Sequence, residues 1–208
     1  MIDTFKRHVK DRAWRESLIL AFVLLGMSLI INFYSGTYAT TVISNPVTDA
    51  ILSNIPVLDV DWLFVYGAYF LIVCLFVIGF RHPERVPFMV KAIAIFYVIR
   101  SIFIMLTHIA PFPSHVIIDP LSVMRVFNFD GQLFFSGHVG LPFLMALTYW
   151  HNKKARYFFL VASVFFGVIV LLGHLHYSID VFAAFFITYG IYHIVAFLFP
   201  HDHFRPRV

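Results

Sequence analysis

The sequence contains a single cysteine, Cys74, among its 208 residues, so it cannot form an internal disulfide framework. Cys74 lies within an apolar run and is interpreted as a small hydrophobic side chain. Charged residues are also scarce, because they make up 12% of the chain against about 25% in a typical soluble domain. Hydrophobic residues make up 61%, and the mean hydropathy is +0.86. This composition excludes an ordinary water-soluble domain and predicts an integral membrane protein.

The basic residues do not indicate a nucleic-acid partner, although the sequence pI is near 9.3. They are dispersed among short segments between the apolar runs. In a membrane protein such charges usually set the orientation of the chain. The expected surroundings are therefore the lipid bilayer, with no nucleic acid.

Six apolar runs approach the roughly 20 residues that an α-helix needs to cross a bilayer. They cover residues 18–34, 62–80, 87–107, 135–150, 157–172 and 179–199. A basic segment, residues 1–16, precedes the first run. No cleavage site of small residues follows that run, so we expect an uncleaved span and not a signal peptide. The predicted fold class is all-α: a polytopic membrane protein with six transmembrane helices in one domain, residues 1–208.

Lysine and arginine indicate how these spans are oriented. They lie in the N-terminal segment, in the loops after the second and fourth spans, and after the sixth: Lys6, Arg7, Lys10, Arg12, Arg15, Arg81, Arg85, Lys153, Lys154, Arg156, Arg205 and Arg207. The opposite loops hold only Arg125. By the positive-inside rule both termini are cytoplasmic. The segments that open the fourth and sixth spans then face the non-cytoplasmic side.

Acidic residues gather on that non-cytoplasmic side, which holds Asp49, Asp59, Asp61, Asp119, Asp130 and Asp180. Asp49 and Asp119 are predicted to be ordinary solvated loop residues. Asp180 differs because it begins an apolar span, where an ionisable group needs a partner. Arg100, in the outer half of the third span, needs an anionic partner or a wet cavity, unless it snorkels to the outer interface.

Two polar segments open spans on this side: Ser136-Gly137-His138 within 134–141, and His174 to Asp180. If the sixth helix starts slightly before His176, Asp180 shares a face with it. The carboxylate would then fix the imidazole tautomer and prepare the other ring nitrogen as a nucleophile or base. Ser136 could cap the next helix or donate to a phosphate oxygen. Gly137 would let an anion approach the first free amides.

These residues resemble the type-2 phosphatidic acid phosphatase superfamily, and in particular its sphingomyelin-synthase-like branch. Ser136-Gly137-His138 is similar to one motif, and the stretch from His176 to Val181 is similar to the second, which reads His-Tyr-Thr-x-Asp-Val. The stretch from Arg100 to Thr107, with the prolines that follow it, is similar to a third motif of that branch. Residues 54–59 are a weaker match to its Pro-Leu-Pro-Asp segment. The resemblance covers nearly the whole chain.

The resemblance implies an integral-membrane lipid phosphatase or phosphotransferase that needs no metal or other cofactor. His176, oriented by Asp180, would attack phosphorus and form a phosphohistidine. His138 would be the acid–base group, and Arg100 would bind phosphate. The donor would be a membrane phospholipid or lipid phosphate. The acceptor would be water or a lipid alcohol such as diacylglycerol or ceramide.

Departures from the family pattern concern the substrate more than the fold. The Lys-x6-Arg-Pro motif of the soluble and classical phosphatases is absent, as it is in the synthase branch. Gly173-His174 stands where that branch has Ser-Arg, which predicts weaker or pH-dependent phosphate binding. Gln132 replaces an expected acidic residue, and Asp130 lies two residues before it. We therefore include His174, Gln132 and Asp130 among the predicted substrate-binding residues, with Ser136 and Gly137.

Two other interpretations stay open. His174, His176 and Asp180 could ligate zinc or another transition metal, or a histidine among the eleven could bind haem. The polar residues could instead line a pathway in a non-catalytic transporter or scaffold. The short loops favour a bacterial inner membrane over a Golgi membrane, with the site facing the periplasm or exterior.

Overall fold

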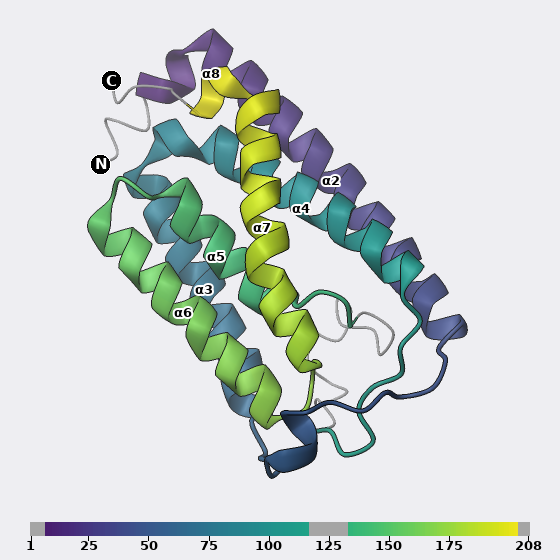
Figure 1. The fold of residues 1–208 in the computed structure, drawn as a ribbon. Coiled ribbons are helices and arrows are strands. Elements are labelled where there is room, and N and C mark those ends of the chain that lie inside the picture. Colours follow the sequence, from purple (N-terminus) through teal and green to yellow (C-terminus); the bar gives the residue numbers. More distant parts are fainter. Residues whose placement is uncertain (1–6, 117–132, 204–208) are drawn as a thin grey trace.

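The computed structural model describes residues 7–116 and 133–203, which fold as a bundle of helices (Figure 1). The helices are α2 (Arg12–Thr41), α3 (Asp61–Arg81), α4 (Val86–Leu106), α5 (Gly137–Thr148), α6 (Lys153–Leu172), α7 (Ser178–Leu198) and α8 (Pro200–His203), with 3-10 turns η1 (Leu52–Asn54) and η2 (Pro83–Arg85). No β-strand occurs in these two ranges. The predicted all-α class is confirmed.

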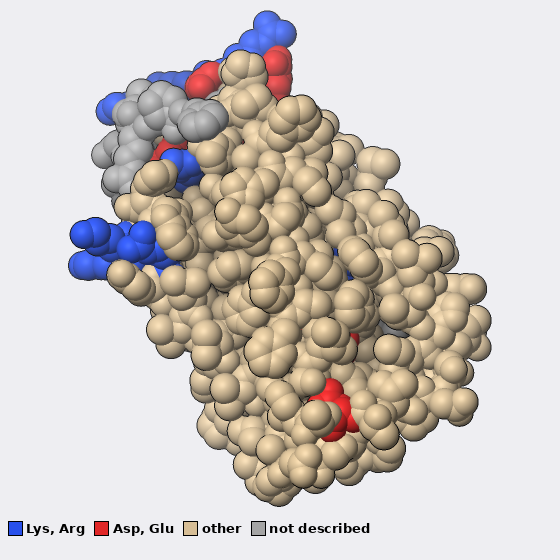
Figure 2. Space-filling view, in the orientation of Figure 1, with Lys and Arg blue, Asp and Glu red and all other residues tan. Residues whose placement is uncertain are grey.

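Five segments are long and apolar enough to cross a membrane: Arg12–Thr41, Asp61–Arg81, Pro83–Leu106, Lys153–Leu172 and Ser178–Leu198. Their outward faces carry large apolar side chains, and Phe186 and Phe197 are 79% and 83% exposed. The face shown in Figure 2 is almost free of charged residues away from one end. In water such a surface would drive association, whereas hydrocarbon covers it at no cost. The structure therefore indicates an integral membrane protein and agrees with five of the predicted spans.

The fourth predicted span, residues 135–150, contains a shorter helix than expected. α5 has 12 residues, and at 1.5 Å per residue it is about 18 Å long, against roughly 30 Å of bilayer hydrocarbon. The residues just before it, 133–136, are not helical, and Ser136 takes the N-cap position in extended conformation. Six full-length spans are therefore not confirmed, because one of the six apolar elements is a partial helix.

The bundle is built around α4. This helix packs along α2 on one side and contacts α5 and α7 on the other, while α5 also packs against α6. Gly140 makes the close approach of α5 possible. A Cβ added there would lie 2.7 Å from Phe96 on α4 and 2.8 Å from Thr188 on α7. The first turn of α5 is thereby held in the interior of the bundle.

The starts of α2, α4 and α6 lie at one end of the molecule, together with α8 (Figure 1). Lys and Arg gather toward this end, here called the basic end and marked by Arg12, Arg81, Arg85, Lys153 and Arg156 (Figure 2). The opposite end, here called the loop end, holds residues 42–60, 107–116 and 173–177. The starts of α3 and α7 lie at the loop end (Figure 1).

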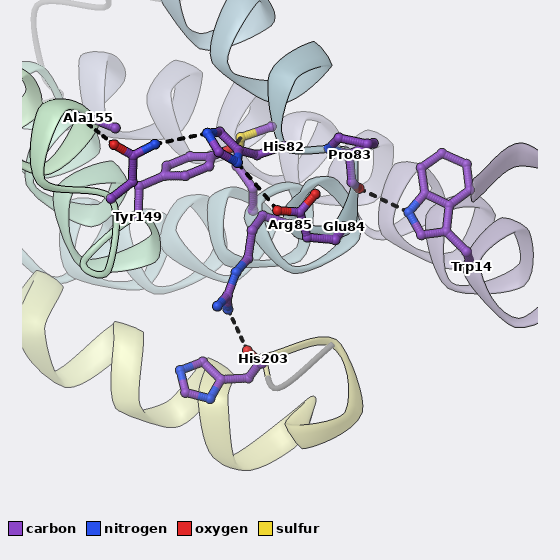
Figure 3. A network of polar contacts seen from close by, with 10 residues as sticks. Trp14, His82, Pro83, Glu84, Arg85, Tyr149, Ala155 and His203 are labelled. Atoms are coloured by element: carbon purple, nitrogen blue, oxygen red, sulfur yellow. Dashed lines mark hydrogen bonds and ion pairs between the residues drawn. The ribbon is translucent and has the colours of Figure 1, made fainter. Parts of the chain in front are cut away.

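Polar contacts fasten the basic end together. Trp14 Nε1 donates to the Pro83 carbonyl at 3.0 Å, and Arg85 donates to the His203 carbonyl (Figure 3). Nearby, the buried Lys91 ammonium pairs with the Asp202 carboxylate at 2.5 Å and donates to Ser17 Oγ at 2.8 Å. These contacts fix α8 against α2, η2 and α4.

Candidate active site

His176 and Asp180 lie on either side of the residue at which α7 begins. The helix starts at Ser178, close to the predicted start of the sixth span at residue 179, so the condition of a helix start before His176 is not met. The two side chains still meet, because Asp180 in the first turn directs its carboxylate back along the chain. Its Oδ2 lies 3.5 Å from His176 Nδ1 and accepts the Tyr177 backbone N–H at 3.0 Å. At this distance the carboxylate faces the imidazole, but His176 Nδ1 has no hydrogen-bond partner among the described residues.

The N-terminus of α5 contacts the backbone of Asp180. The Ser136 backbone N–H donates to the Asp180 carbonyl oxygen at 3.2 Å. Ser136 is the N-cap residue of α5, but its side chain makes no capping hydrogen bond, so the predicted cap is not formed. Its Oγ is buried and has no hydrogen-bond partner among the described residues. A buried hydroxyl beside the first amides of a helix suits an anionic ligand.

Arg100 reaches the same place from α4. Its side chain is 7% exposed, and its Nε donates to the Phe135 carbonyl at 3.0 Å. A Cβ added to Gly137 would lie 3.5 Å from that nitrogen, so the guanidinium lies against the backbone of the α5 start. Arg100 is thus buried inside the bundle and does not snorkel to the outer interface.

His138, the second residue of α5, lies between two aromatic rings. Its ring centroid is 4.0 Å from that of Phe64 on α3 and 5.8 Å from that of Phe166 on α6. It also lies near Arg100 and His176. The aromatic packing fixes the position of the imidazole next to the guanidinium.

A cavity of about 400 Å³ begins at Arg100, Gly137 and His138. The rest of its wall comes from α2 to α6 and is mainly apolar: Leu29, Ala68, Tyr69, Leu71, Ile72, Leu75, Ile93, Tyr97, Leu141, Pro142, Met145 and Phe159. His176 and Asp180 are not part of the wall, and they adjoin it through the contact between Ser136 and Asp180. A cavity with one cationic end and an apolar body suits an amphiphilic anion.

His174 lies in the turn after α6, outside the cavity wall. Its N–H donates to the Leu171 carbonyl at 3.0 Å, and the Leu175 N–H donates to the Val170 carbonyl at 2.8 Å. These two bonds form a Schellman motif with Gly173 at the C-cap. His174 takes the next position with a φ of 52°, in the left-handed region that glycine normally occupies.

The His174 imidazole is held by the loop before the undescribed segment. Its Nδ1 lies 2.7 Å from the Ser114 carbonyl oxygen, and its ring packs edge-on against Phe112 at 5.2 Å. Its Nε2 is buried without a hydrogen-bond partner in the part of the chain that the structure describes. The structure thus does not bring His174 to the cavity wall, and its role in phosphate binding stays a prediction.

Two predicted substrate residues, Gln132 and Asp130, lie outside the described residues. The aromatic neighbours of His138, Phe64 and Phe166, were not foreseen, because phenylalanine occurs 26 times and no local pattern distinguishes these two. Asp49 was also missed. It was predicted to be solvated, but it is buried against the start of α7.

The metal-site alternative finds no support in the donor geometry. Within residues 7–116 and 133–203, no group of three or more His, Cys, Asp or Glu side chains is arranged to hold a metal ion. His174, His176 and Asp180 therefore do not form the ligand set that their spacing allowed.

Comparison with known proteins identifies one similarity. No curated protein and no solved structure matches the chain. Residues 131–197 match a family model described as PAP2 superfamily C-terminal. This range extends from just before α5 almost to the end of α7, and it includes both His segments. The match does not show to which branch of the superfamily the chain is most similar, so the resemblance to the sphingomyelin-synthase-like branch is not confirmed. Across α5, α6 and α7, the chain is similar to the PAP2 superfamily.

Proposed function

We propose that this protein is an integral-membrane lipid phosphatase or phosphotransferase, similar to the sphingomyelin synthases, that works without a metal. The observation that carries the proposal is the hydrogen bond from the Ser136 N–H to the Asp180 carbonyl. It joins the two His segments next to Arg100, at the cationic end of an apolar cavity. The family match over residues 131–197 supports a phosphatase-type reaction on a lipid phosphate.

The phosphate of the donor lipid binds at the start of α5. Arg100 contacts its oxygens through the guanidinium, whose fork geometry matches phosphate. The Ser136 hydroxyl and the amides beside Gly137 donate further hydrogen bonds. The hydrocarbon part of the donor lies along the apolar cavity wall. His174, Gln132 and Asp130 contribute to the choice of head group and acceptor.

The first step breaks the bond between phosphorus and the leaving oxygen. His176 attacks through Nε2 and forms an N–P bond, while its Nδ1–H faces the Asp180 carboxylate. His138 donates a proton to the leaving oxygen. A bound phosphate brings negative charge beside His138, and that charge favours the protonated imidazole needed for this transfer.

The second step transfers the phosphoryl or phospho-head group to the acceptor. His138, now neutral, takes the proton from water or from a lipid alcohol such as diacylglycerol or ceramide. The acceptor oxygen bonds to phosphorus as the N–P bond breaks, and His176 is restored. Water as acceptor makes the protein a phosphatase, and a lipid alcohol makes it a transferase.

The proposed topology has the basic end in the cytoplasm, with both termini there and with α5 as the sixth apolar element. Arginine and lysine at the starts of α4 and α6 support this orientation. The site at the starts of α5 and α7 then opens toward the non-cytoplasmic side. We place the protein in a bacterial inner membrane, with this side facing the periplasm or exterior.

A lipid panel tests the proposal directly. The purified protein is incubated with phospholipids and lipid phosphates, with and without diacylglycerol or ceramide, and the products are identified by mass spectrometry. We expect His176→Ala to lower turnover by roughly 1,000-fold or more, because the covalent step is lost. His138→Ala and Asp180→Ala should each cost about 100-fold or more.

A histidine at the basic end provides the matched control. His151 is exposed and lies far from the cavity, so His151→Ala should keep wild-type turnover. Full turnover by folded His176→Ala would refute the phosphohistidine mechanism. Cleavage of no lipid on the panel by the wild-type protein would refute the function.

A further inference from the structure

The connection between α2 and α3 crosses the loop end and reaches the start of α7. Its key residue is Asp49, which is buried and whose carboxylate accepts four hydrogen bonds. Oδ1 accepts the N–H groups of Ile51 at 2.8 Å and Leu52 at 3.0 Å. Oδ2 accepts the Ser178 N–H at 2.7 Å and the Ser178 hydroxyl at 2.8 Å. The carboxylate thus ties the η1 turn to the first residue of α7.

Tyr177 is held by the same surroundings. Its hydroxyl donates to the Ala110 carbonyl at 2.9 Å and accepts the Val47 N–H at 3.2 Å. Its ring is buried with Leu52, which is itself placed by Asp49. Hydrogen bonds from two connections at the loop end, residues 42–60 and 107–116, therefore hold Tyr177 and Ser178 in place.

Tyr177 and Ser178 lie between His176 and Asp180, followed by Ile179. His176 precedes α7, so no helical hydrogen bond of that helix fixes its backbone. Its distance of 3.5 Å from the Asp180 carboxylate depends on how the chain enters the helix. That entry is set at Tyr177 and Ser178, whose hydroxyl groups contact the loops.

We propose that Asp49 is a positioning residue for the reaction: through Ser178 it holds the start of α7 so that Asp180 faces His176. This inference rests on the proposed function, since it assigns Asp49 a part in the chemistry of His176. Asp49 also accepts the N–H of the first residue of α7, so that amide is not free to bind phosphate.

Kinetics of four variants test this inference. Asp49→Asn and Ser178→Ala weaken the tether from its two sides, and Ser178→Thr keeps the hydroxyl. The control is Thr48→Ala, at an exposed position next to Asp49. We expect Asp49→Asn and Ser178→Ala to lower kcat by roughly 10- to 100-fold, because small misplacements of reacting groups cost that much. KM should change by less than about threefold, since the phosphate ligands are untouched. Ser178→Thr and the control should match the wild type.

Thermal unfolding of the wild type and Asp49→Asn measures separately how much the Asp49 carboxylate stabilises the fold. Burial acts to raise the pKa of Asp49, but the hydrogen bonds from Leu52, Ser178 and Ile51 outweigh it, so the pKa lies below its ordinary value. The ionised Asp49 carboxylate therefore stabilises the folded state. This stabilisation is complete above the ordinary carboxyl pKa of about 4 and is lost as the pH falls through the lower pKa of the folded state. The wild type should therefore unfold at a higher temperature than Asp49→Asn at pH 7, and the difference should shrink below about pH 4.

The outcomes separate the inference from the proposed function. If His176→Ala is inactive while folded Asp49→Asn and Ser178→Ala keep wild-type kcat, Asp49 is purely structural and the inference fails alone. If Ser178→Thr is as slow as Ser178→Ala, the hydroxyl tether is not the cause and the inference also fails. If His176→Ala is active, the proposed function fails first.

Discussion

His174 has two opposing contributions to stability. Its left-handed conformation costs roughly 1–2 kcal/mol relative to glycine, while its hydrogen bond to Ser114 contributes about 0.5–1.5 kcal/mol. Replacement by glycine removes both. We therefore expect His174→Gly to change the free energy of unfolding by less than about 1 kcal/mol. A conformation that glycine would adopt without strain suggests that the imidazole is retained for another reason.

The predicted role of His174 in phosphate binding can be tested by measuring KM. His174→Gly should raise KM for a lipid phosphate several-fold. His115→Gly, at an exposed histidine in the neighbouring loop, serves as the control. An unchanged KM in His174→Gly would leave His174 with a structural role only.

At the residue scale, sequence spacing predicted some contacts and could not predict others. The pairing of His176 with Asp180 was expected from helical spacing, but it forms because Asp180 reaches back from the first turn of α7. The burial of Asp49 could not be foreseen, because its partner Ser178 is 129 positions away. A lone aspartate in a loop carries no local signal of such a partner.

At the element scale, hydropathy located the helices and misjudged one of them. The predicted runs at 62–80, 87–107 and 179–199 agree closely with α3, α4 and α7. α5 is shorter than its apolar run, 135–150, because residues 135–136 stay non-helical before it and residues 149–150 form a turn after it. An apolar run indicates that its residues are buried in hydrocarbon or in protein. It does not indicate whether each of those residues is helical or extended.

The packing of α5 gives a prediction about its glycine. A Cβ at Gly140 would overlap the buried Phe96 ring and the Thr188 hydroxyl, so Gly140→Ala should destabilise the protein by about 1–3 kcal/mol. Gly190 on α7 has no atom within 4 Å of such a Cβ. There alanine should stabilise by up to about 1 kcal/mol through helix propensity. Thermal unfolding in detergent compares the two, and equal midpoints would contradict the close packing of α5.

At the scale of the whole molecule, composition predicted the membrane class, and the basic residues predicted an orientation that can be measured. In a Cys74→Ala background, single cysteines replace the exposed Ser53 at the loop end and His151 at the basic end. A membrane-impermeant maleimide should label Ser53→Cys in intact cells and His151→Cys only after permeabilisation. The reverse pattern would invert the proposed topology and place the site in the cytoplasm.

The buried pair of Lys91 and Asp202 sets an order of events during synthesis. Ser17 and Asp202 are 185 positions apart, so α2 and α4 emerge from the ribosome long before α8. Until then the Lys91 ammonium lacks its carboxylate, and burying it unpaired is costly. The basic end can therefore close only after residue 202 has been synthesised. A chain that stops before residue 202 keeps an unneutralised ammonium at a helix interface.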